Sequence, residues 1–187
     1  MFRESDWTFK TAASGGIGLG SLAASGGMIV LTDAAGKTHQ FKYGGIGGST
    51  GISRLPSRFR LPDIPIPKFL SKSGTIVGSG ATTDFDGGGW VFQTSDRKLS
   101  PEDFEGPTLY FEFSGGVLIA GGVSVLLVGL KEEIVVPFIF NPALFSNLLF
   151  GHASALIVAV GVSEGFIDGI GAGMMFGSIS YGGLYDD

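Results

Sequence analysis

Five glycines recur at intervals of four residues towards the end of the chain: Gly161, Gly165, Gly169, Gly173 and Gly177. In a helix, residues four apart lie on nearly the same face, so this spacing predicts a straight groove without side chains. Because five interior glycines weaken a helix in water by roughly 5 kcal/mol relative to alanine, such a helix needs a close-packed partner or a bilayer. The spacing therefore predicts a glycine zipper over residues 161–177, with a packed soluble helix or a pair of glycine-rich strands as the alternatives.

Two acids lie inside this segment, Glu164 and Asp168, and they are also four residues apart. On a helix they would form a row of carboxylates about 100° around from the glycines. Facing lipid, each carboxylate would cost roughly 2.5–3.5 kcal/mol, whereas rings of acids that face a water-filled lumen favour cations. We therefore predict that they line a pore; on a soluble helix they would be ordinary exposed residues.

A different chemistry is suggested by the run Gly-Gly-Ser-Thr-Gly at residues 47–51, which matches the nucleophile elbow of serine hydrolases by letter. That elbow requires a buried strand before the serine and a helix after it. Here glycines precede Ser49, and an arginine and a proline follow it. The only bases available to it would be His39 and His152. A serine hydrolase is the third of three hypotheses, and the chain is expected not to be an enzyme.

The composition excludes several other classes of protein. The chain has no cysteine and only two histidines, far apart in the sequence, so neither a metal site nor any other cofactor is expected. A net charge of −5 argues against nucleic acid as a partner. Glycine makes up 33 of 187 residues and lies among apolar residues, which favours a glycine-rich β architecture or helices that pack closely in lipid.

The first part of the chain reads as strands. Residues 7–11 and 38–43 alternate bulky and polar side chains, and a short turn at 33–36 predicts a hairpin over residues 27–43. Residues 54–72 hold four prolines and five basic residues, which predicts an extended basic loop. Residues 1–113 are therefore predicted to form a glycine-rich antiparallel β region.

After Ser114 the chain becomes apolar. Residues 114–130 and 134–163 carry no Asp, Glu, Lys or Arg, and no lysine or arginine follows Lys131. The 21 residues from 143 to 163 are about enough to span ~30 Å of hydrocarbon as a helix. We therefore predict an α+β fold in which residues 114–187 form an apolar, helical, membrane-active region. The beginning of the chain lacks a basic leader followed by an apolar run, so export by a specialised machine is expected instead of a Sec signal peptide.

The zipper at residues 161–177, the small size, the missing leader and the missing enzymatic site together resemble the small pore-forming antibacterial effectors of type VI secretion. The resemblance is to the class that makes cation-selective holes in the inner membrane of a rival cell, and it does not extend to residues 1–113. It implies a protein made in the cytoplasm and then secreted, which inserts in a target-cell membrane and forms a pore by self-association. It also implies loading in a secretion tube (Hcp) ring and a cognate membrane immunity protein. The second hypothesis is a structural or adaptor β-sandwich whose apolar segments are its core.

Overall fold

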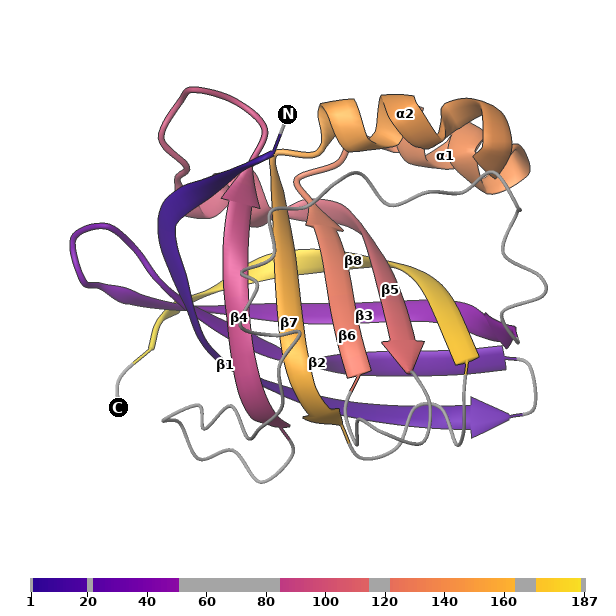
Figure 1. Cartoon of the computed structure of the whole chain (residues 1–187), viewed down its shortest axis with the longest axis horizontal. Coiled ribbons are helices and arrows are strands. Elements are labelled where there is room, and N and C mark those ends of the chain that lie inside the picture. Colours follow the sequence, from indigo (N-terminus) through magenta and orange to yellow (C-terminus); the bar gives the residue numbers. More distant parts are fainter. Residues whose placement is uncertain (1, 20–21, 51–84, 115–121, 164–170, 186–187) are drawn as a thin grey trace, which may run out of the picture.

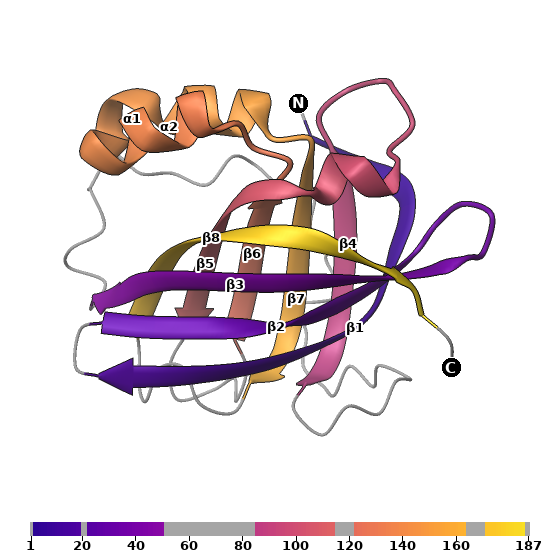
Figure 2. The same cartoon turned by 180° about the vertical axis from the view of Figure 1, so that it is seen from behind.

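A computed structural model describes residues 2–19, 22–50, 85–114, 122–163 and 171–185. Eight strands close into a barrel in which every neighbouring pair is antiparallel, in the order β1-β2-β3-β8-β5-β6-β7-β4 (Figures 1 and 2). The strands are β1 (Arg3–Leu19), β2 (Leu22–Thr32), β3 (Thr38–Thr50), β4 (Phe85–Gln93), β5 (Gly106–Ser114), β6 (Gly122–Val128), β7 (Ala155–Ser163) and β8 (Gly171–Leu184). The helices are the 3-10 turn η3 (Pro101–Phe104), α1 (Glu132–Phe140) and α2 (Pro142–His152).

The predicted α+β fold is wrong, because most of the region expected to be helical forms strands. The uncharged run 134–163 holds the last seven residues of the 9-residue α1, the 11-residue α2 and the strand β7. Pro142 is the first residue of α2 and separates it from α1, and the β-branched residues of 155–163 suit a strand. Strands on both sides of residue 113 build one closed barrel, which also differs from the β-sandwich of the second hypothesis. None of the helices in the described ranges is long and apolar enough to cross a membrane.

The hairpin predicted over residues 27–43 is confirmed as β2 and β3. Their pairing begins beside the turn, at Thr32 and Thr38, and continues to Leu22 and Gly48. Gly36 closes its turn with a φ of 80°, a left-handed conformation that glycine adopts without strain. The strand predicted at 7–11 lies within β1, and the β region predicted over residues 1–113 also contains β4 and all but the last residue of β5. The basic segment 54–72 lies outside the described residues.

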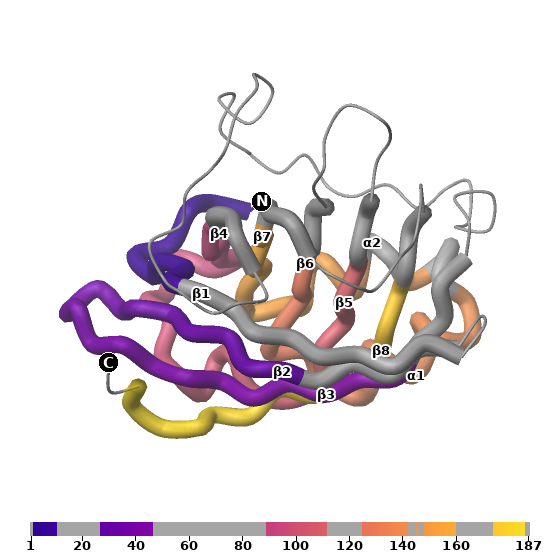
Figure 3. Tube along the Cα trace, turned by 90° about the horizontal axis from the view of Figure 1, so that it is seen from below, coloured from indigo at the N-terminus to yellow at the C-terminus, as the bar shows by residue number. Residues whose placement is uncertain are grey.

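One of the two apolar clusters fills the barrel. It takes buried side chains from seven strands and the partly buried Tyr110 from the eighth, β5. Its largest members include Trp7, Phe41 and Ile157, and Leu99 and Phe104 are added from the β4–β5 connection. Figures 1 and 3 show why one cluster can reach all strands: β1, β2 and β3 cross on one side of the molecule, with β4, β7, β6 and β5 on the other.

The other cluster lies on the outer face of β4, β5, β6 and β7, under the two helices. Its members alternate along the strands with those of the interior, so that Phe92, Leu127 and Leu156 face outward beside the inward Val91, Leu126 and Ile157. Val135 and Phe138 of α1 and Leu149 and Phe150 of α2 complete it. The hairpin of helices therefore covers one apolar side of the barrel wall.

Candidate functional site

The barrel has two ends of different composition. The turn after β2, the connection from β4 to β5 and the helical hairpin between β6 and β7 all join strand ends at one end, here called the plugged end. At the opposite end a row of paired residues runs around five strands: Gly87, Gly161, Gly122, Ser114 and Gly171. These positions continue the alternation of the interior residues on each strand, such as Val91 and Ile157. By this register, the positions of the row that correspond to the interior are glycine and serine.

A second row of glycines crosses the long strands on the other side of the barrel. Gly15 of β1 pairs with Gly26 of β2, which pairs with Gly44 of β3. Next to it, Gly45 of β3 pairs with Gly177 of β8. A methyl group on Gly177 would collide with the backbone of Gly44 and lie 2.7 Å from the Cα of Gly45, and one on Gly45 would lie 2.8 Å from the carbonyl oxygen of Phe176. These strands thus approach closely because neither residue has a side chain.

The five zipper glycines do not form the helical row that their spacing predicts. Gly161 lies in β7, whereas Gly173 and Gly177 lie in β8, and β5 and β6 separate these two strands in the barrel. Gly165 and Gly169 lie outside the described residues. The structure therefore does bring glycine against glycine, but between strands and with partners that four-residue spacing does not reveal.

The predicted pore acids Glu164 and Asp168 also lie outside the described residues. Another acid stands in the row of paired residues next to the first glycine row: Gly89, Ala159, Ser124, Glu112 and Gly173. Glu112 is the one charged residue of these two rows. The alternation of Tyr110, Phe111 and Glu112 along β5 was the signal that could have indicated its position.

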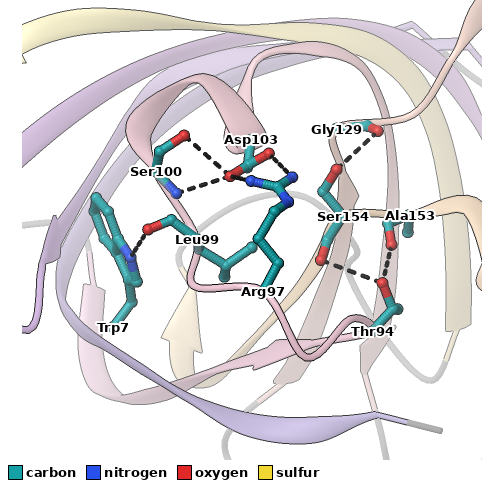
Figure 4. Close-up of polar contacts among 9 residues, drawn as sticks. All are labelled: Trp7, Thr94, Arg97, Leu99, Ser100, Asp103, Gly129, Ala153 and Ser154. Carbon is teal, nitrogen blue, oxygen red and sulfur yellow. Dashed lines mark hydrogen bonds and ion pairs between the residues drawn. The ribbon is translucent and has the colours of Figure 1, made fainter.

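The plugged end is closed by aromatic rings and by a polar clamp in the β4–β5 connection (Figure 4). Phe104 packs against Trp7 and Phe41, with ring centroids 4.8 and 5.2 Å apart. The indole Nε1 of Trp7 donates a hydrogen bond of 3.1 Å to the carbonyl of Leu99. Ser100 caps the 3-10 turn of this connection, and its backbone N–H donates a hydrogen bond of 2.8 Å to the Asp103 carboxylate.

The carboxylate of Asp103 holds this connection in place. It accepts hydrogen bonds from Nη1 and Nη2 of Arg97, and from the backbone N–H and the hydroxyl of Ser100. Burial acts to raise the pKa of Asp103, but the hydrogen bonds from Arg97 and Ser100 outweigh it and lower the pKa overall. The clamp therefore stays ionised at neutral pH and fixes Leu99 and Phe104 in the barrel mouth.

A chain of carboxylate, imidazole and phenol ties the β2–β3 turn to β8. The buried His39 has its Nε2 3.1 Å from Asp33 and its Nδ1 3.0 Å from the Tyr181 hydroxyl. The other oxygen of Asp33 accepts the backbone N–H groups of Ala35 and Lys37, both at 2.8 Å. The hydrogen bond from His39, followed by that from Lys37, lowers the pKa of Asp33.

This arrangement does not supply a base to Ser49. His39 and Ser49 lie ten residues apart on the same strand, which separates them by roughly 33 Å at a rise of ~3.3 Å per residue. His152 is exposed at the last residue of α2, which lies at the plugged end, whereas Ser49 is one residue from the other end of β3. The structure therefore keeps the residues of the hydrolase hypothesis apart.

Because the folded state lowers the pKa of Asp33, the ionised carboxylate stabilises the protein above the ordinary pKa of aspartate, about 3.9. This contribution disappears as the pH falls through the lowered value. We expect Asp33→Asn to melt at a lower temperature than the parent protein at pH 5–7, with the two midpoints converging below about pH 3.9. Thermal unfolding followed by circular dichroism over a pH series measures this. Asp96→Asn is the control, because Asp96 is 99% exposed in its ion pair with Arg3, and an Asp33→Asn gap that does not change with pH would contradict the argument.

No family model and no solved structure matches the chain. The chain is similar to the toxin protein Tse4 of Pseudomonas aeruginosa, with 32% identity over 163 residues, which are 86% of this chain and 76% of that protein. The chain belongs to the Tse4 family. The 163 aligned residues extend far beyond residues 161–177 and include most of the part of this chain that forms the barrel.

Proposed function

We propose that this protein is a secreted, non-enzymatic antibacterial toxin of type VI secretion that inserts in a target-cell membrane and forms a pore that favours cations. The observation that carries the proposal is the membership of the Tse4 toxin family, found in a chain whose barrel has a glycine-rich inner face at one end. The lipid of the target cell's inner membrane is then the partner to which the toxin binds when it acts. Self-association, an Hcp ring and a cognate membrane immunity protein are further partners that we propose from the resemblance.

The lengths of the strands support a barrel that spans the membrane and conducts ions through its lumen. A transmembrane strand needs about 9–11 residues, and every strand except the seven-residue β6 has at least nine. In a closed antiparallel wall the backbone groups bond between strands, as a hydrocarbon surrounding demands. One row of positions that correspond to the interior by register is glycine and serine, and small residues at interior positions occupy less of a barrel's lumen than large ones.

The plugged end shows which change conduction requires. Trp7, Phe41 and Phe104 fill the interior there, so this structure is a closed form. The membrane form must displace these rings from the lumen or open the wall as several copies join. We propose that acids give the pore its cation preference. The candidates are Glu112, whose register continues the interior positions of β5, and the two acids Glu164 and Asp168.

The test is leakage from liposomes that hold a potassium gradient. We expect the purified protein to dissipate this gradient, and Glu112→Gln to retain leakage while lowering the preference for potassium over chloride. Vesicles that hold their gradient over a range of protein concentrations and lipid compositions would show that the protein is not a pore. Release of fatty acid or headgroup would instead support the hydrolase hypothesis.

A further inference from the structure

Exposed apolar side chains gather on the hairpin of α1 and α2. Val136, Ile139 and Phe140 on α1 are 50%, 45% and 84% exposed, and Leu148 on α2 is 41% exposed. Val136, Ile139 and Phe140 are spaced three and four residues apart, so they lie on one face of α1. We call these four residues the hairpin patch. It holds more than half of the seven large apolar side chains that are exposed in the described part of the chain.

The opposite face of the same hairpin is already occupied. Val135 and Phe138 are buried on the outer wall of the barrel, and the Phe138 ring lies 6.2 Å from that of Phe176 in β8. On α2, Phe150 is buried against Phe2, with ring centroids 6.4 Å apart. Helix α1 is therefore apolar on both faces after its first two residues, a pattern typical of helices surrounded by apolar material. Of these two faces, only the one on the barrel wall is covered by residues that the structure describes.

The charge around the patch indicates what covers the other face. Lys131, Glu132 and Glu133 are exposed before and at the start of α1, and no Asp, Glu, Lys or Arg follows until after residue 163. A protein interface has a polar rim and is enriched in aromatic residues, Met and Arg, whereas acyl chains offer no hydrogen bonds and suit a face of aliphatic and phenyl groups. Figures 1 and 2 show the hairpin at the edge of the molecule, where a flat surface can reach it.

We propose that the hairpin patch docks on a lipid bilayer and is the first part of the protein to enter it. The proposal rests on the proposed function, since it names the surface through which the toxin meets its membrane. The patch lies at the depth of the headgroup and acyl boundary, with Phe140 as the deepest group. Because Glu132 and Glu133 lie next to the patch and the net charge is −5, neutral lipid is preferred over anionic lipid.

The experiment compares binding of the full chain and its variants to phosphatidylcholine vesicles by co-flotation. The variant Val136→Ser, Ile139→Ser, Phe140→Ser removes the α1 part of the patch at positions that are at least 45% exposed, so the barrel core is untouched. We expect its partition coefficient to fall by more than about 100-fold, and that of Phe140→Ser alone by about tenfold. The controls are Ile46→Ser on β3 and Leu184→Ser on β8, which are 72% and 56% exposed and should bind within about twofold of the parent. Circular dichroism at matched concentration verifies the fold of each variant.

Two results would overturn the proposal: equal binding of the triple variant and the parent, or no binding of the parent to these vesicles. A triple variant that is monomeric where the parent forms dimers without lipid would instead assign the patch to a second copy of the chain. The failure of the proposed function is a separate result. A parent that binds vesicles through the patch without releasing potassium refutes the pore alone, and a triple variant that leaks as fast as the parent refutes the docking surface alone.

Discussion

Gly177→Leu should prevent β3 and β8 from pairing and abolish both the native fold and any toxicity. Even Gly177→Ala should lower the free energy of unfolding by about 3 kcal/mol, because the added methyl group meets the backbone of Gly44 and not a side chain that can turn away. Chemical denaturation measures the stability. The depolarisation of cells that direct each variant to the periplasm, at matched protein levels, measures the toxicity.

Two glycines provide matched controls for this substitution. A Cβ on Gly44, one residue before the partner of Gly177, would meet nothing within 4 Å, and the same holds for Gly151 in α2. Gly44→Ala should therefore be tolerated, and Gly151→Ala should raise stability by about 0.5–1 kcal/mol, since alanine is the better helix former. If Gly177→Ala is as stable as Gly44→Ala, the close approach of the two strands is not required.

Within residues 1–113 the sequence indicated which residues lie in strands better than how the strands combine. The hairpin at 27–43 was predictable because alternation and a turn of the right length lie within 17 residues of each other. The pairing of Gly45 with Gly177 joins positions 132 residues apart, and no local pattern encodes it. Residues 155–163 show a second limit: a short uncharged run of Val, Ile and Ala fits a buried strand and a membrane helix equally well, and only the covering helices decide between them.

For the candidate site, too, the sequence indicated the important residue type but not its arrangement in the fold. The sequence singled out glycine at residues 161–177 because glycine allows backbones to approach closely in both helices and strands, and Gly177 makes such an approach to β3. The geometry assigned to it was wrong, since a four-residue interval fits a helix row and is also a multiple of the two-residue period of a strand. Gly173 and Gly177 satisfy the second period, and both follow the alternation of Ile179 on β8.

Phe104→Ala should open the plugged end of the barrel. Phe104 is fully buried and contacts Trp7 and Phe41, so its loss leaves a cavity where the β4–β5 connection closes the mouth, and should cost about 3–5 kcal/mol of stability. If the interior must be vacated before ions pass, the same variant should release potassium from liposomes at a lower protein concentration than the parent. A loss of stability together with a gain of leakage is the result that distinguishes a plug from an ordinary core residue.

Phe104→Leu is the control, because it retains most of the apolar volume and should lose only about 1–2 kcal/mol with little change in leakage. A second variant that loses the same stability at a site away from the mouth distinguishes removal of the plug from easier unfolding of the whole protein. Phe138→Ala serves this purpose, because Phe138 is equally buried but lies outside the barrel wall, under the helices. Should Phe138→Ala and Phe104→Ala increase leakage to the same extent, loosening of the fold would account for the effect, and the rings at the mouth would not be the gate.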